Sequence, residues 1–231
     1  MSEPEATAFP PPGVFDANAL LQCYAQGVFP MGEARDDPLV FLVEPDQRGV
    51  IPLDGFHIPT RLRRTIRREP FEVRTNTAFS GVLDACAAPA PGREDTWING
   101  PIRNLYLQLH AMGRAHSLEC WDGDRLVGGL YGVSLGAAFF GESMFSRETD
   151  ASKIALVHLV ARLRVGGWRL LDAQFRTPHL DQFGLIETPQ SDYLKVLRAA
   201  LTGNPDASAL TRPLTGEEAV AYALQPTTQA S

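Results

Sequence analysis

Apolar and polar residues alternate after the glycine pair at 166–167, and this pattern predicts a buried β-strand over residues 168–175. In a strand, alternate side chains share a face, so Asp172 and Gln174 point the same way. A buried carboxylate and a buried amide are costly unless they are paired. The two residues therefore either satisfy a neighbouring backbone edge or serve a reaction.

The spacing of apolar residues elsewhere predicts helices followed by an antiparallel meander. Phe79, Val82 and Cys86 recur at i, i+3 and i+7, which is the period of an amphipathic helix. Asp150 is expected to cap a later helix. The predicted helices cover residues 76–87, 101–113, 151–165 and 191–201, and the other predicted strands cover residues 39–43, 115–121, 125–133 and 137–145.

This order of elements predicts an α+β fold with a mixed, largely antiparallel sheet and helices on its faces. A meander that leads to a capped helix and a further strand is compatible with the acetyltransferase-like (GNAT) topology. A connector with proline and glycine separates a small N-terminal domain, residues 14–56, from a GNAT-like catalytic domain, residues 57–201. Residues 1–13 and 202–231 are expected to be tails, with a helix in the second near residues 217–224.

The composition is that of an ordinary globular protein, with 44% hydrophobic and 21% charged residues. The net charge of −6 argues against a wholly basic nucleic-acid coat but allows a local basic patch. The three cysteines lie far apart and are expected to be free thiols in the cytoplasm. The longest uncharged run, residues 126–141, is too short for a membrane span, and the N-terminus has no apolar core of a secretory signal.

The segment 61–68 is rich in arginine, and its two apolar residues, Leu62 and Ile66, are four residues apart. The two apolar residues can dock one narrow stripe of a helix, and the arginines cover the rest of its circumference. These arginines form either a solvated basic face or a contact to a phosphate backbone.

Common catalytic signatures are missing from the sequence. There is no Walker A motif, and the segment that starts at Gly141 resembles a nucleophile elbow without its final glycine. An acyl-CoA enzyme would carry a glycine-rich turn at residues 147–153, where this chain has no glycine. The glycines of the meander mark a bulge or the close approach of a ligand. The apolar residues near them line a pocket or belong to the core: Leu130, Phe139, Met144, Leu156 and Leu171.

A series of short motifs runs through the chain. The most specific are Gly141-Glu142-Ser143-Met144-Phe145-Ser146 and Asp172-x-Gln174, and the others are Tyr24-x-x-Gly27-x-Phe29-Pro30, Pro45-Asp46-x-Arg48, Thr96-Trp97-Ile98, Ala115-His116-Ser117-x-Glu119-x-Trp121, Leu126-Val127-Gly128-Gly129-Leu130-Tyr131-Gly132-Val133 and Ala151-Ser152-Lys153. Together they resemble the bacterial leucyl/phenylalanyl-tRNA–protein transferases, from about residue 16 to residue 200.

The resemblance implies a GNAT-like catalytic domain behind a small N-terminal domain, and it implies a reaction. Such an enzyme moves leucine or phenylalanine from aminoacyl-tRNA to an acceptor protein that begins with Arg or Lys, and so forms an N-degron. An aminoacyl ester is activated relative to the amide that forms, so no cofactor and no metal are expected. The site must supply orientation, proton removal and oxyanion stabilisation. A cytoplasmic monomer is expected.

The resemblance also assigns roles at the reacting centre. It implies that Gln174 contacts the attacking amine or the reacting carbonyl, and that Asp172 orients it or draws off positive charge. Glu142 completes the catalytic set, and Glu142 and Asp172 are hypothesised to favour a basic first residue of the acceptor. The implied pocket for the transferred side chain consists of Leu130, Phe139, Met144, Leu156, Leu159 and Leu171.

On the tRNA side, the resemblance places Trp97 near the terminal adenosine, where stacking tolerates imperfect geometry. The arginines implied to meet the acceptor stem are Arg61, Arg64 and Arg68. One departure concerns the tryptophan pair that many members carry before Ser-Pro-Asp-Pro-Arg, because this chain has Leu42-Val43-Glu44 there. Phe41 is a candidate substitute. Two other functions stay open: a GNAT-type N-acyltransferase that uses acyl-CoA, and a non-catalytic tRNA-binding module.

Overall fold

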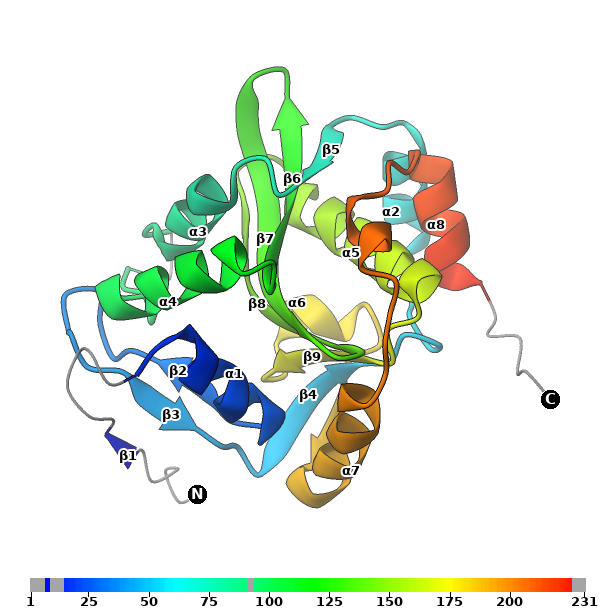
Figure 1. Cartoon of the computed structure of the whole chain (residues 1–231). Helices are drawn as coiled ribbons and strands as arrows, with labels where there is room; N and C mark the ends of the chain where they lie inside the picture. The colour runs from blue at the N-terminus through cyan, green and yellow to red at the C-terminus, as the bar shows by residue number, and fades with distance from the viewer. Residues whose placement is uncertain (1–6, 9–14, 91–93, 226–231) are drawn as a thin grey trace.

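A seven-stranded mixed sheet forms the centre of the computed structural model, which describes residues 7–8, 15–90 and 94–225 (Figure 1). Its described strands follow the order β10-β4-β9-β8-β7-β6-β5, and neighbours are antiparallel except for the parallel pair β8 and β9. A smaller antiparallel sheet has the order β1-β3-β2. The strands are β1 (Thr7–Ala8), β2 (Phe29–Met31), β3 (Phe41–Val43), β4 (Gln47–Ile51), β5 (Glu72–Thr75), β6 (Ala115–Asp122), β7 (Arg125–Leu135), β8 (Ala138–Ser146), β9 (Leu170–Gln174) and β10 (Ile186–Pro189).

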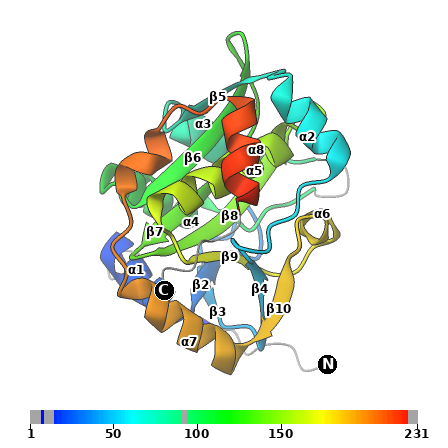
Figure 2. The same ribbon diagram turned by 90° about the vertical axis from the view of Figure 1, so that its right-hand side faces the viewer.

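Helices cover both faces of the large sheet, and each face has its own hydrophobic core (Figures 1 and 2). The first core, which we call the α5 core, lies against α2, α5 and α8, and the second, the α4 core, lies against α1, α3, α4 and α7. The helices are α1 (Ala17–Ala25), α2 (Thr60–Arg67), α3 (Phe79–Ala87), α4 (Gly100–Ala111), α5 (Ala151–Gly166), α6 (Pro178–Asp181), α7 (Gln190–Leu201), the 3-10 helix η1 (Ala207–Thr211) and α8 (Gly216–Leu224). This arrangement confirms the predicted α+β fold.

The predicted helix over residues 76–87 begins three residues late in the structure. Asn76 adopts a left-handed backbone with φ of 59°, and its side-chain oxygen accepts a hydrogen bond from the Ser117 N–H at 2.9 Å. This contact holds the chain against β6 before α3 starts at Phe79. Apolar spacing could not show it, because the partner lies in a distant strand.

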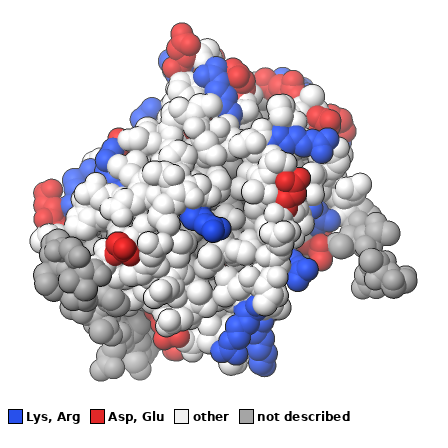
Figure 3. Space-filling view, viewed as in Figure 1, with Lys and Arg blue, Asp and Glu red and all other residues white. Residues whose placement is uncertain are grey.

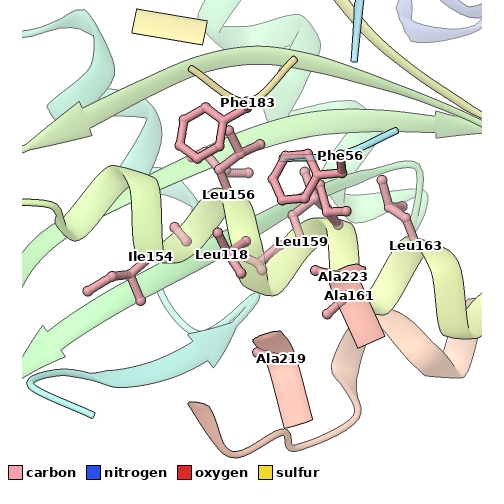
Figure 4. Packing of buried hydrophobic residues seen from close by; sticks show 14 of the residues in the cluster. Phe56, Leu118, Ile154, Leu156, Leu159, Ala161, Leu163, Phe183, Ala219 and Ala223 are labelled. Atoms are coloured by element: carbon pink, nitrogen blue, oxygen red, sulfur yellow. The ribbon is translucent and has the colours of Figure 1, made fainter. Parts of the chain in front are cut away.

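Helix α5 is buried nearly all round because other elements pack on opposite sides of it (Figure 4). The rings of Phe56 and Phe183 stack on one side with centroids 5.5 Å apart. Ala219 and Ala223 of α8 approach from the other side, where their small side chains allow close contact between the two helices. The α5 core therefore joins segments that are far apart in sequence, from Ile51 to Ala223.

The C-terminal segment belongs to this packed body. Val220 is buried in the same core as the two alanines, and Thr215 and Glu218 form a capping box that starts α8. The expected tail from residue 202 is therefore packed as far as the end of α8, since η1 and α8 bury apolar residues against α5. The predicted helix near residues 217–224 corresponds to α8.

Asp150 precedes α5 but does not cap it, so that prediction is wrong. Its φ of 65° is left-handed, and its carboxylate bonds to the Lys153 ammonium at 2.7 Å. The Ser152 N–H at the helix start donates instead to the Ser146 hydroxyl oxygen at 3.1 Å. The cap therefore comes from the end of β8 and ties that strand to the helix.

The N-terminal segment shares its core with the rest of the chain. Leu20 and Tyr24 of α1 pack in the α4 core together with Leu197 of α7. Strand β4 lies between β10 and β9, so the domain boundary expected at residue 56 falls beyond a strand of the large sheet. The expected tail over residues 1–13 lies outside the described residues, apart from β1, which pairs with β3.

The surface shows no broad field of one charge on the face in Figure 3, where acidic and basic side chains are interspersed among uncharged residues. Ion pairs contribute to this mixture, such as Arg67 of α2 with Glu217 of α8 at 2.6 Å. In the described part of the chain, no helix combines the length and apolar character that crossing a membrane requires.

Candidate active site

The parallel strands β8 and β9 diverge after a short overlap and leave a cleft between them. Residues 138–140 of β8 pair with residues 170–172 of β9, whereas β8 continues to Ser146 and β9 to Gln174. The diverging ends enclose a cavity of about 490 Å³. This volume falls within the range of small-molecule sites in proteins.

A β-bulge marks the point of divergence. Opposite β7, Gly132 pairs with Gly141 but Tyr131 pairs with Ser143, so Glu142 is an extra residue on β8. A bulge of this kind re-aims side chains and is frequent beside active sites. The glycines of the meander were interpreted as marking either a bulge or the close approach of a ligand, and the structure shows a bulge at Gly132 and Gly141.

The bulge changes which face each β8 side chain joins. Phe140 and Phe145 both pack in the α4 core, although an unbroken strand puts residues five apart on opposite faces. Met144 consequently packs against the α5 core and lines the cavity, while Glu142 reaches side chains of α1 and α4. Neighbouring residues of one strand thus supply an apolar wall and a carboxylate to the same site.

Most of the residues expected to hold an apolar side chain do line this cavity. Phe139 does not line it, because it precedes the divergence, opposite Leu171, and its fully buried ring packs against Gly132. Phe139 therefore packs behind the residues that line the cavity and does not contact the cavity itself. The expected residues that line the cavity are Leu130, Met144, Leu156, Leu159 and Leu171.

Asp172 forms a buried ion pair with Arg48, and the two side chains are 0% and 1% exposed. The Arg48 Nε lies 2.9 Å from Oδ1, and its Nη2 lies 2.7 Å from Oδ2. The Tyr193 hydroxyl donates to Oδ2 at 2.6 Å, and the Gln174 N–H donates to Oδ1 at 2.8 Å. Both carboxylate oxygens are therefore occupied, which suits a positioning role better than proton removal.

Arg48 is itself held from several directions. Its guanidinium carbon lies 4.6 Å from the Phe29 ring centroid and 4.7 Å from that of Tyr193. Its Nη1 donates to the Gly27 carbonyl oxygen at 2.8 Å. A buried ion pair needs such additional partners to offset the cost of desolvation. Since these partners come from different elements, the Arg48–Asp172 pair fixes β4, β9 and α7 relative to one another.

Gln174 ends β9 with a φ of 55°, in the left-handed region that non-glycine residues seldom occupy. Its N–H bond to Asp172 holds the backbone in this conformation. The side-chain Nε2 lies 3.4 Å from Oε1 of Glu142 across the cleft. Strained backbone of this kind gathers at functional sites, and here it turns an amide towards the carboxylate of β8.

Glu142 is the titratable group of the cleft that lies opposite Gln174. Its pKa is raised from 4.5 to about 7, chiefly by burial and to a smaller extent by the Asp172 charge, while hydrogen bonds from Tyr24 and Tyr106 and the Arg48 charge oppose the shift. The Tyr24 hydroxyl donates to Oε1 at 2.7 Å, and the Tyr106 hydroxyl donates to Oε2 at 2.7 Å. A carboxyl with a pKa near neutrality can accept and return a proton at physiological pH.

The two tyrosines can hold Glu142 in both protonation states. Their hydroxyl oxygens lie 2.9 Å apart, so three short contacts join Tyr24, Tyr106 and Glu142. Two hydroxyl hydrogens serve these contacts when Glu142 is ionised, and a third hydrogen completes the ring when it is protonated. Proton uptake therefore requires little rearrangement.

Residues of the N-terminal segment and of the loop before α4 form the outer wall of the cavity. Trp97 lines it and meets the Tyr106 ring edge-on at 6.4 Å. Phe29 and Met31 of β2 line it too. Phe41, the candidate substitute for the missing tryptophans, lies in β3 outside the cavity lining.

The arginines expected to contact tRNA lie on α2 and at its C-terminal end, outside the cavity lining. Arg61, Arg64 and Arg68 are exposed, and none of them lines the cavity. Leu62 and Ile66 anchor the helix in the α5 core, as their spacing predicted. A contact between α2 and a substrate would therefore involve a part of that substrate outside the cavity.

Several residues of the site had no assigned role at the level of sequence. Tyr24 and Arg48 belong to short motifs, but nothing in those motifs shows their partners. Tyr106 lies on the apolar face of α4, and Tyr193 lies on that of α7. A buried tyrosine needs a partner for its hydroxyl, and this need was the available signal.

Metal binding has no candidate among the residues that the structure covers, because no three His, Cys, Asp or Glu side chains gather there. The α+β fold places an apolar cavity beside a buried carboxyl with a pKa of about 7, an arrangement that suits an enzyme acting on an apolar group.

Comparison with known proteins identifies the family. The family model for the leucyl/phenylalanyl-tRNA protein transferase matches residues 50–198, and the model for its N-terminal domain matches residues 13–46. A leucyl/phenylalanyl-tRNA–protein transferase from Phenylobacterium zucineum is 61% identical over 218 residues, which cover 94% of this chain and 99% of the relative. Relatives of the same name from Maricaulis maris and Caulobacter vibrioides are each 58% identical over 217 residues, with 94% of this chain and 99% and 98% of the relatives covered.

The chain belongs to the leucyl/phenylalanyl-tRNA–protein transferase family, and it is an aminoacyltransferase that acts between tRNA and protein. The two family matches are separated by residues 47–49, which begin β4 and include Arg48.

Proposed function

We propose that the chain transfers leucine or phenylalanine from aminoacyl-tRNA to the N-terminal Arg or Lys of acceptor proteins, and that the product is an N-degron. The observation that carries this proposal is an apolar cavity that ends at Glu142 and Gln174. The apolar part accommodates the transferred side chain, and the polar end faces the ester. We propose that the enzyme works as a monomer in the cytoplasm, where charged tRNA is available.

The reaction needs few groups. The acceptor's α-amine attacks the ester carbonyl, the new C–N bond forms, and the bond to the ribose oxygen breaks. An α-amine has a pKa near ~7.7–8, so part of it is already neutral at pH 7. Glu142 accepts the proton that the amine loses and returns it to the ribose oxygen as this leaves. The ester supplies the driving force, so the proposal includes no cofactor.

Gln174 and Asp172 have separate tasks in this proposal. The Gln174 amide contacts the attacking amine or the reacting carbonyl, where a fixed donor stabilises developing negative charge. Asp172 positions Gln174 through the backbone N–H and keeps its own charge paired with Arg48. Because that charge is already neutralised, selection for a basic first residue falls to Glu142 rather than to Asp172.

The tRNA occupies a wider surface than the cleft. Trp97 is proposed to stack on the terminal adenosine at the cavity wall. Arg61, Arg64 and Arg68 are proposed to contact phosphates of the acceptor stem, which lies outside the cavity. Phosphate contacts position a nucleic acid without reading its sequence, and this suits an enzyme that accepts more than one tRNA.

The Met144→Phe variant should lower kcat/KM for phenylalanyl-tRNA about 10-fold or more relative to leucyl-tRNA. The larger ring narrows the cavity, and a mismatch of about one methylene is worth roughly 10- to 200-fold in such pockets. Parallel transfer assays with the two charged tRNAs measure the ratio. In the control, Phe139→Leu, the ratio should stay unchanged while stability falls, because Phe139 packs behind the wall. A changed ratio in the control alone would contradict this assignment.

The proposed function is tested by transfer of labelled leucine from leucyl-tRNA to peptides that begin with Arg, Lys, Asp or Ala. Label should reach the Arg and Lys peptides. Transfer to Asp instead would redirect the acceptor class, and binding of charged tRNA without any transfer would indicate a tRNA-binding module. Acetyl-CoA binding without tRNA binding would favour the acyl-CoA alternative.

A further inference from the structure

The cleft is lined by strand edges rather than by one face of a strand. Residues 141–146 of β8 line the cavity as an unbroken run, and so do residues 171–175 across from them. When a face lines a cavity, alternate residues contribute, because side chains point up and down in turn. A consecutive run shows that the backbone edge itself is presented to the cavity.

The edge of β8 has no strand beside it over this stretch. In the described sheet, β8 pairs with β9 through residue 140 and with β7 along its other side to Ser146. In an antiparallel pair, alternate residues direct their N–H and C=O groups to the neighbour, and the rest direct them away. Half of the backbone groups beyond the bulge therefore point into the cleft, where they can pair with an added strand.

We infer that the acceptor protein binds by adding its N-terminal residues as a short strand along the free edge of β8, residues 141–146. This inference rests on the proposed function, and it concerns how the acceptor backbone is held. The Glu142 carboxyl lies at the inner end of the edge and meets the acceptor's amine there. The acceptor then runs outward towards Ser146, parallel to β8.

This mode of binding explains how one enzyme accepts many proteins. Backbone hydrogen bonds hold an extended peptide whatever its side chains, and side-chain pockets add specificity at chosen positions. Here selection is concentrated at the first residue, beside Glu142, and the following residues contribute through their backbone. The strand β9 ends at Gln174, so the outer part of the acceptor pairs with β8 alone.

The test is a scan of single N-methyl groups through positions 2 to 5 of a hexapeptide that begins with Arg. The enzyme stays unaltered, and the unmodified peptide is the reference for label transfer from leucyl-tRNA. Methylation at alternate positions should raise KM about 3- to 10-fold, because each removes one backbone hydrogen bond, while kcat stays the same. The intervening positions should change KM less than about twofold, since their N–H groups point away from β8.

A flat KM profile, or losses in kcat without alternation, would overturn the inference. Either result would assign the β8 edge to the donor ester or to solvent. These outcomes differ from failure of the proposed function, in which the unmodified Arg peptide itself receives no label.

Discussion

The Asp172→Ala variant should lose about 3–5 kcal/mol of unfolding free energy, because it leaves the Arg48 guanidinium charged, unpaired and 1% exposed. The Tyr193 hydroxyl and the Gln174 N–H lose their acceptor at the same time. Urea unfolding followed by circular dichroism measures the loss. Transfer activity should fall as well, since Gln174 loses the bond that holds its left-handed backbone.

A triple variant separates the structural role of Asp172 from its positioning role. R48M/D172L/Y193F replaces the charged pair and the tyrosine hydroxyl with apolar groups of similar size, and such exchanges are often neutral for stability. We expect unfolding stability to recover to a large extent while kcat stays low, because Gln174 is still unanchored. Full recovery of kcat would contradict the positioning role and leave Asp172 as a purely structural residue.

The Glu142→Gln variant should lower kcat about 100- to 10,000-fold, which is the usual contribution of a general acid–base group. Glutamine keeps the size and can still contact Tyr24 and Tyr106, so the fold should change little. Affinity for charged tRNA should stay within about twofold, since the lost interaction belongs to the transition state. Single-turnover transfer and a filter-binding assay measure the two quantities.

The pH profile of the same variant provides an independent readout. Because the pKa of Glu142 is about 7, its basic form accumulates above pH 7, and kcat/KM of the native enzyme should rise through that pH. In Glu142→Gln, the rise of kcat/KM near pH 7 should disappear, and the rise that comes from deprotonation of the acceptor's amine, near pH ~8, should remain. Tyr24→Phe removes a hydrogen bond that lowers the Glu142 pKa, so it should move the first rise to higher pH. An unchanged first rise in Glu142→Gln would exclude Glu142 as the base.

Local periodicity determined much of the fold. The meander, α4, α5 and α7 lie within a few residues of their predicted ranges, because each depends on side chains that are neighbours in sequence. The same reasoning placed Asp172 and Gln174 on one strand of the site. Local periodicity did not place α8 in the core. The small apolar residues of α8 are typical of a tail, and only their contact with α5 in the folded chain shows that they are buried.

The roles of the site residues depended on contacts between distant segments. Arg48 meets Asp172 from 124 residues away, and this pairing favours a positioning role for Asp172 over proton removal. Tyr24 lies 118 residues from Glu142 and joins it through a bulge that no hydrophobic pattern shows. The bulge shifts the alternation of β8 by one residue, so the faces predicted from an unbroken strand do not apply beyond it.

By itself, the sequence determined the class of fold, most of the elements and the identity of the chemical groups, through local spacing and through motifs. The tertiary structure decided that Phe139 lies behind the pocket, that Glu142 carries a pKa of about 7, and that Asp172 is already paired. The physical reason is that burial and pairing are set by what packs around a group, and spacing along the chain carries no information about those neighbours.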